Sequence, residues 1–225
     1  MGNMIGKGIS RCIRIAIVGA GEFGLQAVHY ININRTNGFS VEIAGWFDDT
    51  KTKGTVIMGC EVLGGIKDID TYFREDKFDE LFIALGYKHL DFKKHLIEIF
   101  KSKIPLANII STPVSIDYTV KLGCNVMIYP GCIIDKEVII EDGVTINLGS
   151  IVSHNSTVGI CSFLAPRVTV AGFSTIGACS FLGIGSTVID NINICDYVHT
   201  GAGAVITEDI MKAGLYLGLP AKLYK

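Results

Sequence analysis

The sequence predicts an α/β domain followed by a β-solenoid: a small Rossmann-like domain over residues 1–111 and a parallel β-helix over residues 112–225. Two observations predict this fold class. A six-residue repeat runs without interruption from Ile116 to Ile206, and a GxGxxG motif follows an apolar segment near the N-terminus. Strands alternate with period two and helices with a period of about 3.6, so neither keeps a six-residue repeat over so long a stretch.

The repeat has two inward-facing positions. The first position is aliphatic in fifteen of sixteen hexads, and the fifth is small or β-branched throughout. Each hexad therefore supplies one short strand and one corner, and three hexads make one coil of a triangular prism in which residues 18 apart stack. The aliphatic series is expected to form the core. On the repeat alone, a solenoid without enzymatic activity remains an alternative.

The first domain begins with a buried strand predicted at residues 13–18, a GxGxxG motif at 19–24 and a helix over 25–33. The glycines permit a tight turn and let a phosphate approach backbone N–H groups at the helix N-terminus. A second strand, 41–47, ends in two acidic residues that can take ribose hydroxyls or base N–H groups. The candidate ligand contacts are Gly19, Ala20, Gly21, Asp48 and Asp49.

The rest of this domain is predicted as a strand at 80–85, an amphipathic helix at 91–103 and a strand at 104–110. The apolar face expected for this helix consists of Phe92, Leu96, Ile99 and Phe100. A GxGxxG motif also suggests an NAD-dependent oxidoreductase, but only the β-helix follows this domain and no second substrate domain does. A purely structural glycine turn and a nucleotide-linked ligand both remain open.

The composition limits which binding partners and which cellular compartment are expected for this protein. The net charge is −2, from 20 basic and 22 acidic residues without a basic cluster, so no nucleic-acid partner is expected. No apolar run is long enough to predict a membrane span, and residues 1–11 lack the apolar core of a signal peptide. Seven cysteines without a CxxC pair predict reduced thiols in the cytoplasm, with neither disulfides nor a metal site.

Short motifs in both halves carry a family resemblance: Gly19-Ala20-Gly21, Gly45-Trp46-Phe47-Asp48-Asp49, Val62-Leu63-Gly64-Gly65, Ile146-Asn147, Val152-Ser153-His154 and Gly218-Leu219-Pro220-Ala221-Lys222. With these motifs, nearly the whole chain resembles the PglD/NeuD/VioB-type sugar acyltransferases of bacterial glycan and lipopolysaccharide O-antigen pathways. The resemblance implies a left-handed β-helix that binds acetyl-CoA and half a Rossmann fold that binds the nucleotide of an activated sugar. It also implies a homotrimer with active sites between adjacent subunits.

The resemblance assigns roles by position. It implies that His154 is the catalytic histidine, that Asn147 lies near the sugar's amino group, and that the backbone N–H of Gly172 meets the thioester carbonyl. The nucleotide sugar would bind at Gly19, Ala20, Gly21, Asp48, Asp49 and Asn147. Coenzyme A would contact Gly172, Gly201, Ala202, Gly203, Pro220 and Lys222.

Two positions depart from the family pattern. Members usually carry a histidine shortly after the second glycine, where this chain has Glu22-Phe23-Gly24, so a phosphate contact is lost or replaced. Members also usually place Asp or Glu directly after the catalytic histidine, where this chain has Asn155. An acidic neighbour fixes the imidazole tautomer and stabilises the imidazolium, whereas an amide orients the ring without neutralising its charge.

The sequence therefore predicts an acetyl-CoA-dependent N-acetyltransferase acting on a nucleotide-linked amino sugar, with a 4-amino-4,6-dideoxyhexose as the expected sugar. An amine demands less of its base than an alcohol does, so the Asn155 departure favours N-acetylation. His154 would act as general base in a direct transfer, with Asn155 orienting its ring. O-acetylation of a sialic acid-like sugar and a non-catalytic scaffold that binds a nucleotide sugar remain alternatives. So do a surface role for His154 and a backbone-satisfying role for Asn147.

Overall fold

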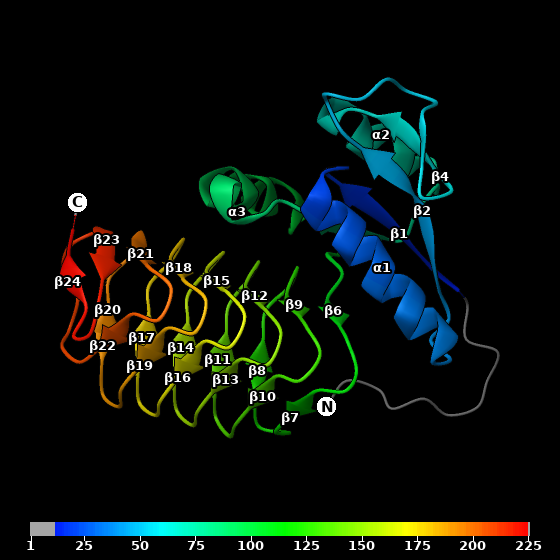
Figure 1. Ribbon diagram of the computed structural model, residues 1–225. Coiled ribbons are helices and arrows are strands. Elements are labelled where there is room, and N and C mark those ends of the chain that lie inside the picture. The colour runs from blue at the N-terminus through cyan, green and yellow to red at the C-terminus, as the bar shows by residue number, and fades with distance from the viewer. Residues whose placement is uncertain (1–11, 225) are drawn as a thin grey trace. The chain divides into compact units, whose positions relative to one another are not determined.

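The computed structural model describes residues 12–224 as two compact units (Figure 1). The first unit comprises the chain up to Gly86 together with Glu98–Ile109, and the second comprises Tyr87–Ile97 together with the chain from Ile110 onward. Residues 1–11, on which the signal-peptide expectation rests, lie outside the described residues. The predicted boundary at residues 111 and 112 stays a prediction. Within residues 12–224, no helix is long and apolar enough to cross a membrane.

The first unit is built on a five-stranded sheet in the order β3-β4-β2-β1-β5. β1 (Ile13–Val18) pairs in parallel with β2 (Val41–Phe47) on one side and with β5 (Glu80–Ile83) on the other. β4 (Cys60–Gly64) continues the parallel arrangement beside β2, and β3 (Val56–Ile57) pairs with β4 in the antiparallel direction. The first two strands have the boundaries that the sequence predicts.

The helices of the described chain are α1 (Glu22–Thr36), α2 (Ile69–Arg74) and α3 (Leu90–Phe100), with short 3-10 turns η1 (Ile66–Asp68) and η2 (Tyr87–His89). The first helix begins three residues earlier than predicted, inside the glycine motif. Its N-cap is the second glycine of that motif, which provides no side-chain hydrogen bond. The start of α1 therefore lies in the glycine loop, where the sequence predicts that backbone N–H groups meet a phosphate.

The strand predicted at residues 104–110 is wrong. Only β6 (Ile109–Ile110) is extended enough to be a strand, and an isolated bridge joins Leu81 to Leu106. The segment before it is tied to β5 through Pro105, whose carbonyl accepts the N–H of Leu81 at 2.9 Å. An apolar composition alone did not distinguish this loop from a strand.

The buried face of α3 differs in part from the prediction. Leu96 and Phe100 are buried as predicted, but Phe92 is 46% exposed and Lys93 is buried instead. The buried face includes Lys93 because this side chain reaches the β-helix, where its Nζ donates to the carbonyl of Gly143 at 2.7 Å. The long aliphatic stem of lysine packs as an apolar group while its ammonium finds a partner, which a hydrophobic pattern does not reveal.

The second unit is a parallel β-helix of very short strands, as the hexads predict. Strands 18 residues apart pair in parallel, for example Ile134 with Val152 and Val152 with Val170. They form three sheets: sheet I (β22-β19-β16-β13-β10-β7), sheet II (β20-β17-β14-β11-β8) and sheet III (β24-β23-β21-β18-β15-β12-β9-β6). The strand bounds are β7 Ser115–Ile116, β8 Lys121–Leu122, β9 Met127–Ile128, β10 Ile133–Ile134, β11 Ile139–Ile140, β12 Thr145–Ile146, β13 Ile151–Val152, β14 Thr157–Val158, β15 Phe163–Leu164, β16 Thr169–Val170, β17 Thr175–Ile176, β18 Phe181–Leu182, β19 Thr187–Val188, β20 Asn193–Ile194, β21 Val198–Thr200, β22 Val205–Ile206, β23 Gly214–Leu217 and β24 Lys222–Leu223.

From Asn125 onward, each corner is turned by one residue in the left-handed backbone region. Every sixth residue from Asn125 to Gly203 has a φ between 51° and 80°. Glycine and asparagine adopt this region readily, whereas other residues are held there by the fold. The corner residues are Asn125, Gly131, Glu137, Gly143, Gly149, Asn155, Cys161, Arg167, Phe173, Cys179, Gly185, Asn191, Tyr197 and Gly203.

Serines at the fifth hexad position are fully buried beside the aliphatic core. Ser156 shows how they are satisfied: its Oγ donates to the carbonyl of Ala171 at 3.0 Å and accepts the N–H of Ser174 at 3.2 Å. A buried hydroxyl with both roles filled links one coil to the next. The serines that share this burial are Ser150, Ser156, Ser162, Ser174, Ser180 and Ser186.

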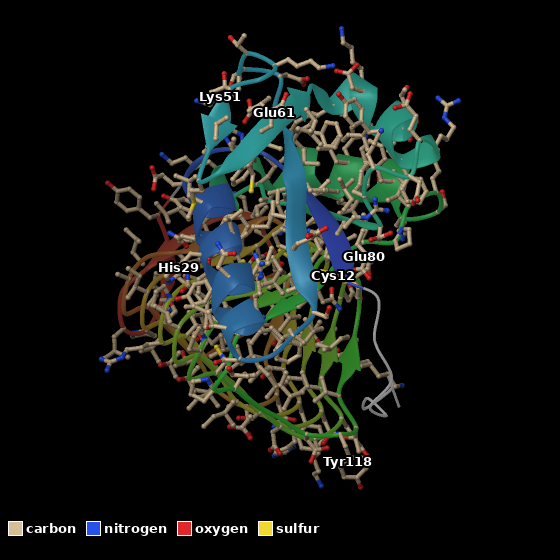
Figure 2. All side chains as sticks on the ribbon, turned by 90° about the vertical axis from the view of Figure 1, so that its right-hand side faces the viewer. Cys12, His29, Lys51, Glu61, Glu80 and Tyr118 are labelled. Atoms are coloured by element: carbon tan, nitrogen blue, oxygen red, sulfur yellow. The ribbon has the colours of Figure 1, made fainter. Side chains whose placement is uncertain are left out.

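The corner between sheets I and II carries the residues of most interest. Tyr118, Lys136, His154 and Gly172 follow sheet I strands at intervals of 18 residues and therefore stack along this corner. Tyr118, which is 95% exposed, projects from the first coil and marks the corner in Figure 2. His154 lies two coils further along.

Candidate functional site

His154 is half-buried at the corner between β13 and β14, with its ring against the next coil. The imidazole meets Phe173 edge to face, with ring centroids 5.1 Å apart and an angle of 83° between the planes. A Cβ on Gly172 would lie 2.6 Å from Cε1 of the imidazole. The ring therefore occupies space that exists because residue 172 has no side chain.

A chain of two hydrogen bonds holds the other edge of the ring. Nδ1 of His154 lies 3.2 Å from Oδ1 of Asn155. The Nδ2 of Asn155 in turn donates to Oε2 of Glu137 at 2.6 Å. Glu137 was not predicted from the sequence, although it lies 18 residues before Asn155, which is the stacking interval of the repeat.

The edge of His154 that carries Nε2 is open in the sense that this nitrogen makes no hydrogen bond within the part of the chain that the structure describes. Among the hydrogen bonds of residues 12–224, only Nδ1 of this ring has a partner. The backbone N–H of Gly172 likewise donates to no group of the described chain, although its carbonyl accepts the N–H of Asn191 at 3.0 Å. An unengaged ring nitrogen beside an unengaged N–H is the arrangement required of a general base next to an oxyanion donor.

The Gly172 segment is rigidly held. The N–H of Phe173 donates to the carbonyl of His154 at 3.1 Å, and Ser156 anchors both Ala171 and Ser174. The corresponding N–H at the next corner, at Ala178, is capped by an aspartate at 2.7 Å. The Gly172 N–H therefore differs from that corner in being uncapped.

Asn147 lies on a different corner, between β12 of sheet III and β13 of sheet I. Its Oδ1 accepts the N–H of Leu148 at 2.7 Å, so half of the amide satisfies backbone, as one alternative reading expected. Within the described chain, its Nδ2 has no hydrogen-bond partner, and no contact joins Asn147 to His154 in one subunit. The role of this amide near a sugar stays a prediction.

The residues predicted to contact coenzyme A divide between two places. Gly201 to Gly203 follow β21 on the same corner as Asn147, three coils further along. A side chain on Gly201 would overlap Leu217, so this backbone is closely approached by the C-terminal strands. Ala202 is exposed.

The C-terminal tail folds back on the last coil. β24 pairs with β23 in the antiparallel direction, and exposed Pro220 lies in the turn between these strands. Lys222 places its Nζ 3.6 Å from the carboxylate of Glu208, and both side chains are largely exposed. A lysine in so exposed a pair keeps its charge available to an anionic ligand. The coenzyme A contacts of Pro220 and Lys222 stay predictions.

The three glycines of the GxGxxG motif in the first unit have distinct roles. Gly19 has a φ of +96°, and a Cβ there would lie 3.0 Å from the carbonyl oxygen of Ala84. A Cβ on Gly24 would overlap the carbonyl of Gly19 and press on Trp46, so this glycine lets α1 approach the sheet. Gly21 meets nothing within 4 Å, so it alone leaves open space for a ligand.

The two acidic residues after β2 are engaged within the unit. Asp48 accepts the N–H of Ala20 at 2.8 Å through Oδ2, and the N–H and hydroxyl of Thr50 through Oδ1. Partial burial acts to raise the pKa of Asp48, but the hydrogen bonds from Thr50 and Ala20 outweigh it and hold the pKa below its usual value. Asp49 accepts the N–H of Ile66 at 2.9 Å. Both carboxylates therefore fasten loops, and their contact with a nucleotide stays a prediction.

No group of three or more His, Cys, Asp or Glu side chains in residues 12–224 is placed to hold a metal ion. The described site instead consists of an imidazole, an amide, a carboxylate and a backbone N–H. These groups suit proton transfer and the binding of a developing negative charge.

Comparison with known proteins connects this geometry to a family. A family model described as a CoA-binding domain matches residues 7–110. The structure of PerB from Caulobacter crescentus, in complex with CoA and GDP-perosamine, is 27% identical and superposes with a TM-score of 0.83 over 97% of this chain and 99% of PerB. The chain is similar over nearly its whole length to hexapeptide-repeat sugar acetyltransferases of the PglD/NeuD type. Its second unit is accordingly a left-handed parallel β-helix, as in those acetyltransferases.

Two further relatives bear on fold and length. The acetyltransferase domain of PglB from Neisseria gonorrhoeae, in complex with acetyl coenzyme A, is 22% identical with a TM-score of 0.82, covering 96% of this chain and 100% of that domain, and so shows the shared fold. A UDP-3-O-acylglucosamine N-acyltransferase from Delftia acidovorans is 35% identical over 100 residues, or 44% of this chain. That match spans only 29% of the relative's length.

Proposed function

We propose that this protein is an acetyl-CoA-dependent N-acetyltransferase of a nucleotide-linked amino sugar, with His154 as general base. One observation carries the proposal: the open edge of the His154 imidazole lies beside the unengaged N–H of Gly172, on a fold shared over almost its whole length with PerB. The ligands in PerB, CoA and GDP-perosamine, make an amino sugar linked to a nucleotide the leading acceptor, with a 4-amino-4,6-dideoxyhexose as the specific candidate.

The chemistry is a direct transfer. The neutral amine of the sugar attacks the thioester carbonyl, so a C–N bond forms while the C–S bond breaks. The carbonyl oxygen gains negative charge, which the N–H of Gly172 would stabilise by a hydrogen bond. Nε2 of His154 accepts the proton that the amine loses, and the leaving thiolate of coenzyme A is reprotonated.

The first unit is proposed to hold the nucleotide of the sugar, and the β-helix to hold coenzyme A. The open space at Gly21 and the uncapped N-terminus of α1 support a phosphate contact in the first unit. The matched family model is described as a CoA-binding domain, which gives the opposite assignment for residues 7–110. If the first unit holds the nucleotide, a substitution at Gly21 should raise the KM for the nucleotide sugar. If it holds coenzyme A, the same substitution should raise the KM for acetyl-CoA.

Assembly and compartment belong to the same proposal. Asn147 and His154 lie on different corners of one subunit without touching, which fits a site completed by a neighbouring copy in a homotrimer. The protein would act in the cytoplasm, where nucleotide sugars and acetyl-CoA are made. Sedimentation equilibrium tests the assembly: a mass of three chains supports the trimer, and a monomer that retains full activity contradicts it.

The function is tested by release of coenzyme A, measured by thiol trapping. Acetyl-CoA is offered with UDP-, dTDP- and GDP-linked 4-amino sugars, and with matched sugars that carry a hydroxyl in place of the amine. Turnover confined to the amino sugars, and lost in His154→Ala, is the expected result. Turnover of the hydroxyl sugars would replace the proposal with O-acetylation. Binding of nucleotide sugars without any turnover would point to a scaffold.

A further inference from the structure

We propose that Glu137 is a positioning residue that acts through Asn155 to select the productive tautomer of His154. The three side chains form a continuous hydrogen-bonded series from the imidazole to a carboxylate. The proposal rests on the proposed function for its kinetic consequence. Its structural consequence, the tautomer of the imidazole, is measurable without any substrate.

The carboxylate of Glu137 determines the orientation of the Asn155 amide. An ionised carboxylate only accepts hydrogen bonds, so the group within 2.6 Å of Glu137 Oε2 must be the donating Nδ2. The opposite face of the amide, Oδ1, then meets the ring at 3.2 Å. Without a carboxylate on this side, either orientation of the amide satisfies its hydrogen bonds.

The orientation of the Asn155 amide in turn determines the tautomer of the His154 imidazole. Because Oδ1 is an acceptor, Nδ1 of His154 carries the proton in the neutral ring. Nε2 is then left with its lone pair, and it is the nitrogen on the open edge of the ring. If the amide turned over, Nδ2 would favour an unprotonated Nδ1, and Nε2–H could no longer accept a proton from the amine.

The corner fixes Glu137 in place. Its backbone N–H donates at 2.7 Å to the hydroxyl of Thr119, which is itself bound to Asp117. Glu137 and Asn155 occupy the same left-handed corner position in successive coils. Within residues 12–224, Glu137 forms no ion pair, so its charge is not compensated by a basic side chain of this chain. The negative charge that Asn155 lacks is thus supplied from one coil earlier.

The kinetic effect is expected to be moderate because the carboxylate is exposed and acts through an amide. Glu137→Gln keeps the shape but allows both amide orientations, so kcat is expected to fall about 10-fold with KM values unchanged. Combining Glu137→Gln with Asn155→Asp moves the carboxylate next to the ring, and kcat is expected to return to within about 3-fold of wild type.

A matched control is available on the same coil. Glu141 is also exposed, and its Oε2 accepts the N–H of Ile160 at 2.8 Å on the next coil, but at another corner. Glu141→Gln therefore makes the same chemical change at a comparable coil-to-coil hydrogen bond without touching the His154 series. Its kcat is expected to stay at the wild-type value.

The experiment combines these kinetics with nitrogen-15 NMR of the five histidines, the signals of His154 being assigned by their loss in His154→Ala. The Nδ1–H tautomer is expected in wild type, a gain of Nε2–H in Glu137→Gln, and Nδ1–H again in the double variant. An unchanged tautomer in Glu137→Gln, or an equal loss of kcat in Glu141→Gln, would overturn the proposal. Absence of turnover in wild type would count against the proposed function alone, since the tautomer still decides the role of Glu137.

Discussion

The glycine loop of the first unit and the His154 corner of the β-helix both carry polar groups that the sequence singled out, yet the structure treats them differently. Asp48 and Asp49 are bound to the backbone of neighbouring loops. At the His154 corner, Nε2 and the N–H of Gly172 make no hydrogen bond within the described chain. These polar groups are thus engaged in hydrogen bonds in one unit and, within the part of the chain that the structure describes, left without such partners in the other.

This difference teaches where to look for chemistry in such a molecule. A protein satisfies nearly all of its buried polar groups, so a rigidly held donor or acceptor without a partner is informative. By that criterion, the β-helix corner is the proposed reacting centre, and the glycine motif of the first unit offers one open position, at Gly21. Substitutions at the open groups should change kinetics, and substitutions at the engaged groups should change stability.

The largest effect is expected at His154. His154→Ala removes the base, so kcat should fall about 10³-fold with little change in the melting temperature. Steady-state kinetics with a saturating amino sugar measure this loss. His95→Ala, which removes an exposed histidine on α3, is the control and should leave kcat unchanged. Comparable losses in both variants would contradict a special role for the corner.

Gly172→Ala tests the space beside the ring. The new Cβ would lie 2.6 Å from Cε1 of His154, so the imidazole must swing away from Asn155 and from the reacting atoms. We expect kcat to fall about 100-fold while the free energy of unfolding changes little, since a side chain rather than backbone is displaced. Kinetics and denaturant unfolding on one preparation check both parts. A stable variant with wild-type kcat would remove Gly172 from the site.

The glycine motif offers a matched pair with opposite outcomes. Gly24→Ala would press a methyl group against the carbonyl of Gly19, and should lower the free energy of unfolding by about 3 kcal/mol. Gly21→Ala meets nothing within 4 Å, so the fold should be retained while the KM for the nucleotide sugar rises about 5-fold. If the KM for acetyl-CoA rose instead, the first unit would be the coenzyme A site.

The smallest effect concerns Lys93, whose burial lowers its pKa from the ordinary 10.5 to about 8. The unfolded chain therefore binds more protons than the folded chain between these values, and stability rises with pH in that window. From pH 8 to 9 the gain should be about 1 kcal/mol. Lys93→Met should lose this rise, as measured by urea unfolding at several pH values. An identical dependence of the free energy of unfolding on pH in wild type and Lys93→Met would contradict the lowered pKa of Lys93.

Different parts of this account could be predicted from the sequence to different degrees. The hexads predict the β-helix because every coil repeats the same local packing, so Ile134, Val152 and Val170 stack as their spacing requires. The face of α3 could not be predicted in the same way, because the burial of Lys93 depends on a carbonyl 50 residues away. The 18-residue interval points to Glu137, but the family pattern places the acidic residue next to His154, so the motif alone does not predict this carboxylate.

The glycine motif shows a second limit. The sequence predicted the turn, but both carboxylates of the acidic pair were assigned to a ligand. Their partners, the N–H groups of Ala20 and Ile66, belong to other loops that only the folded unit brings near. Motif spacing therefore predicts the turn but not these tertiary hydrogen bonds, and the contact of the two carboxylates with a nucleotide stays a prediction.

The measurement that tests the central claim most directly is the structure of the product. Wild-type protein is incubated with carbon-13-labelled acetyl-CoA and the nucleotide-linked amino sugar that supports turnover, and the product is examined by NMR. The account predicts an acetamide on the sugar nitrogen, formed in wild type and not in His154→Ala. An acetyl ester on a sugar hydroxyl, or an acetamide formed equally well without His154, would contradict it.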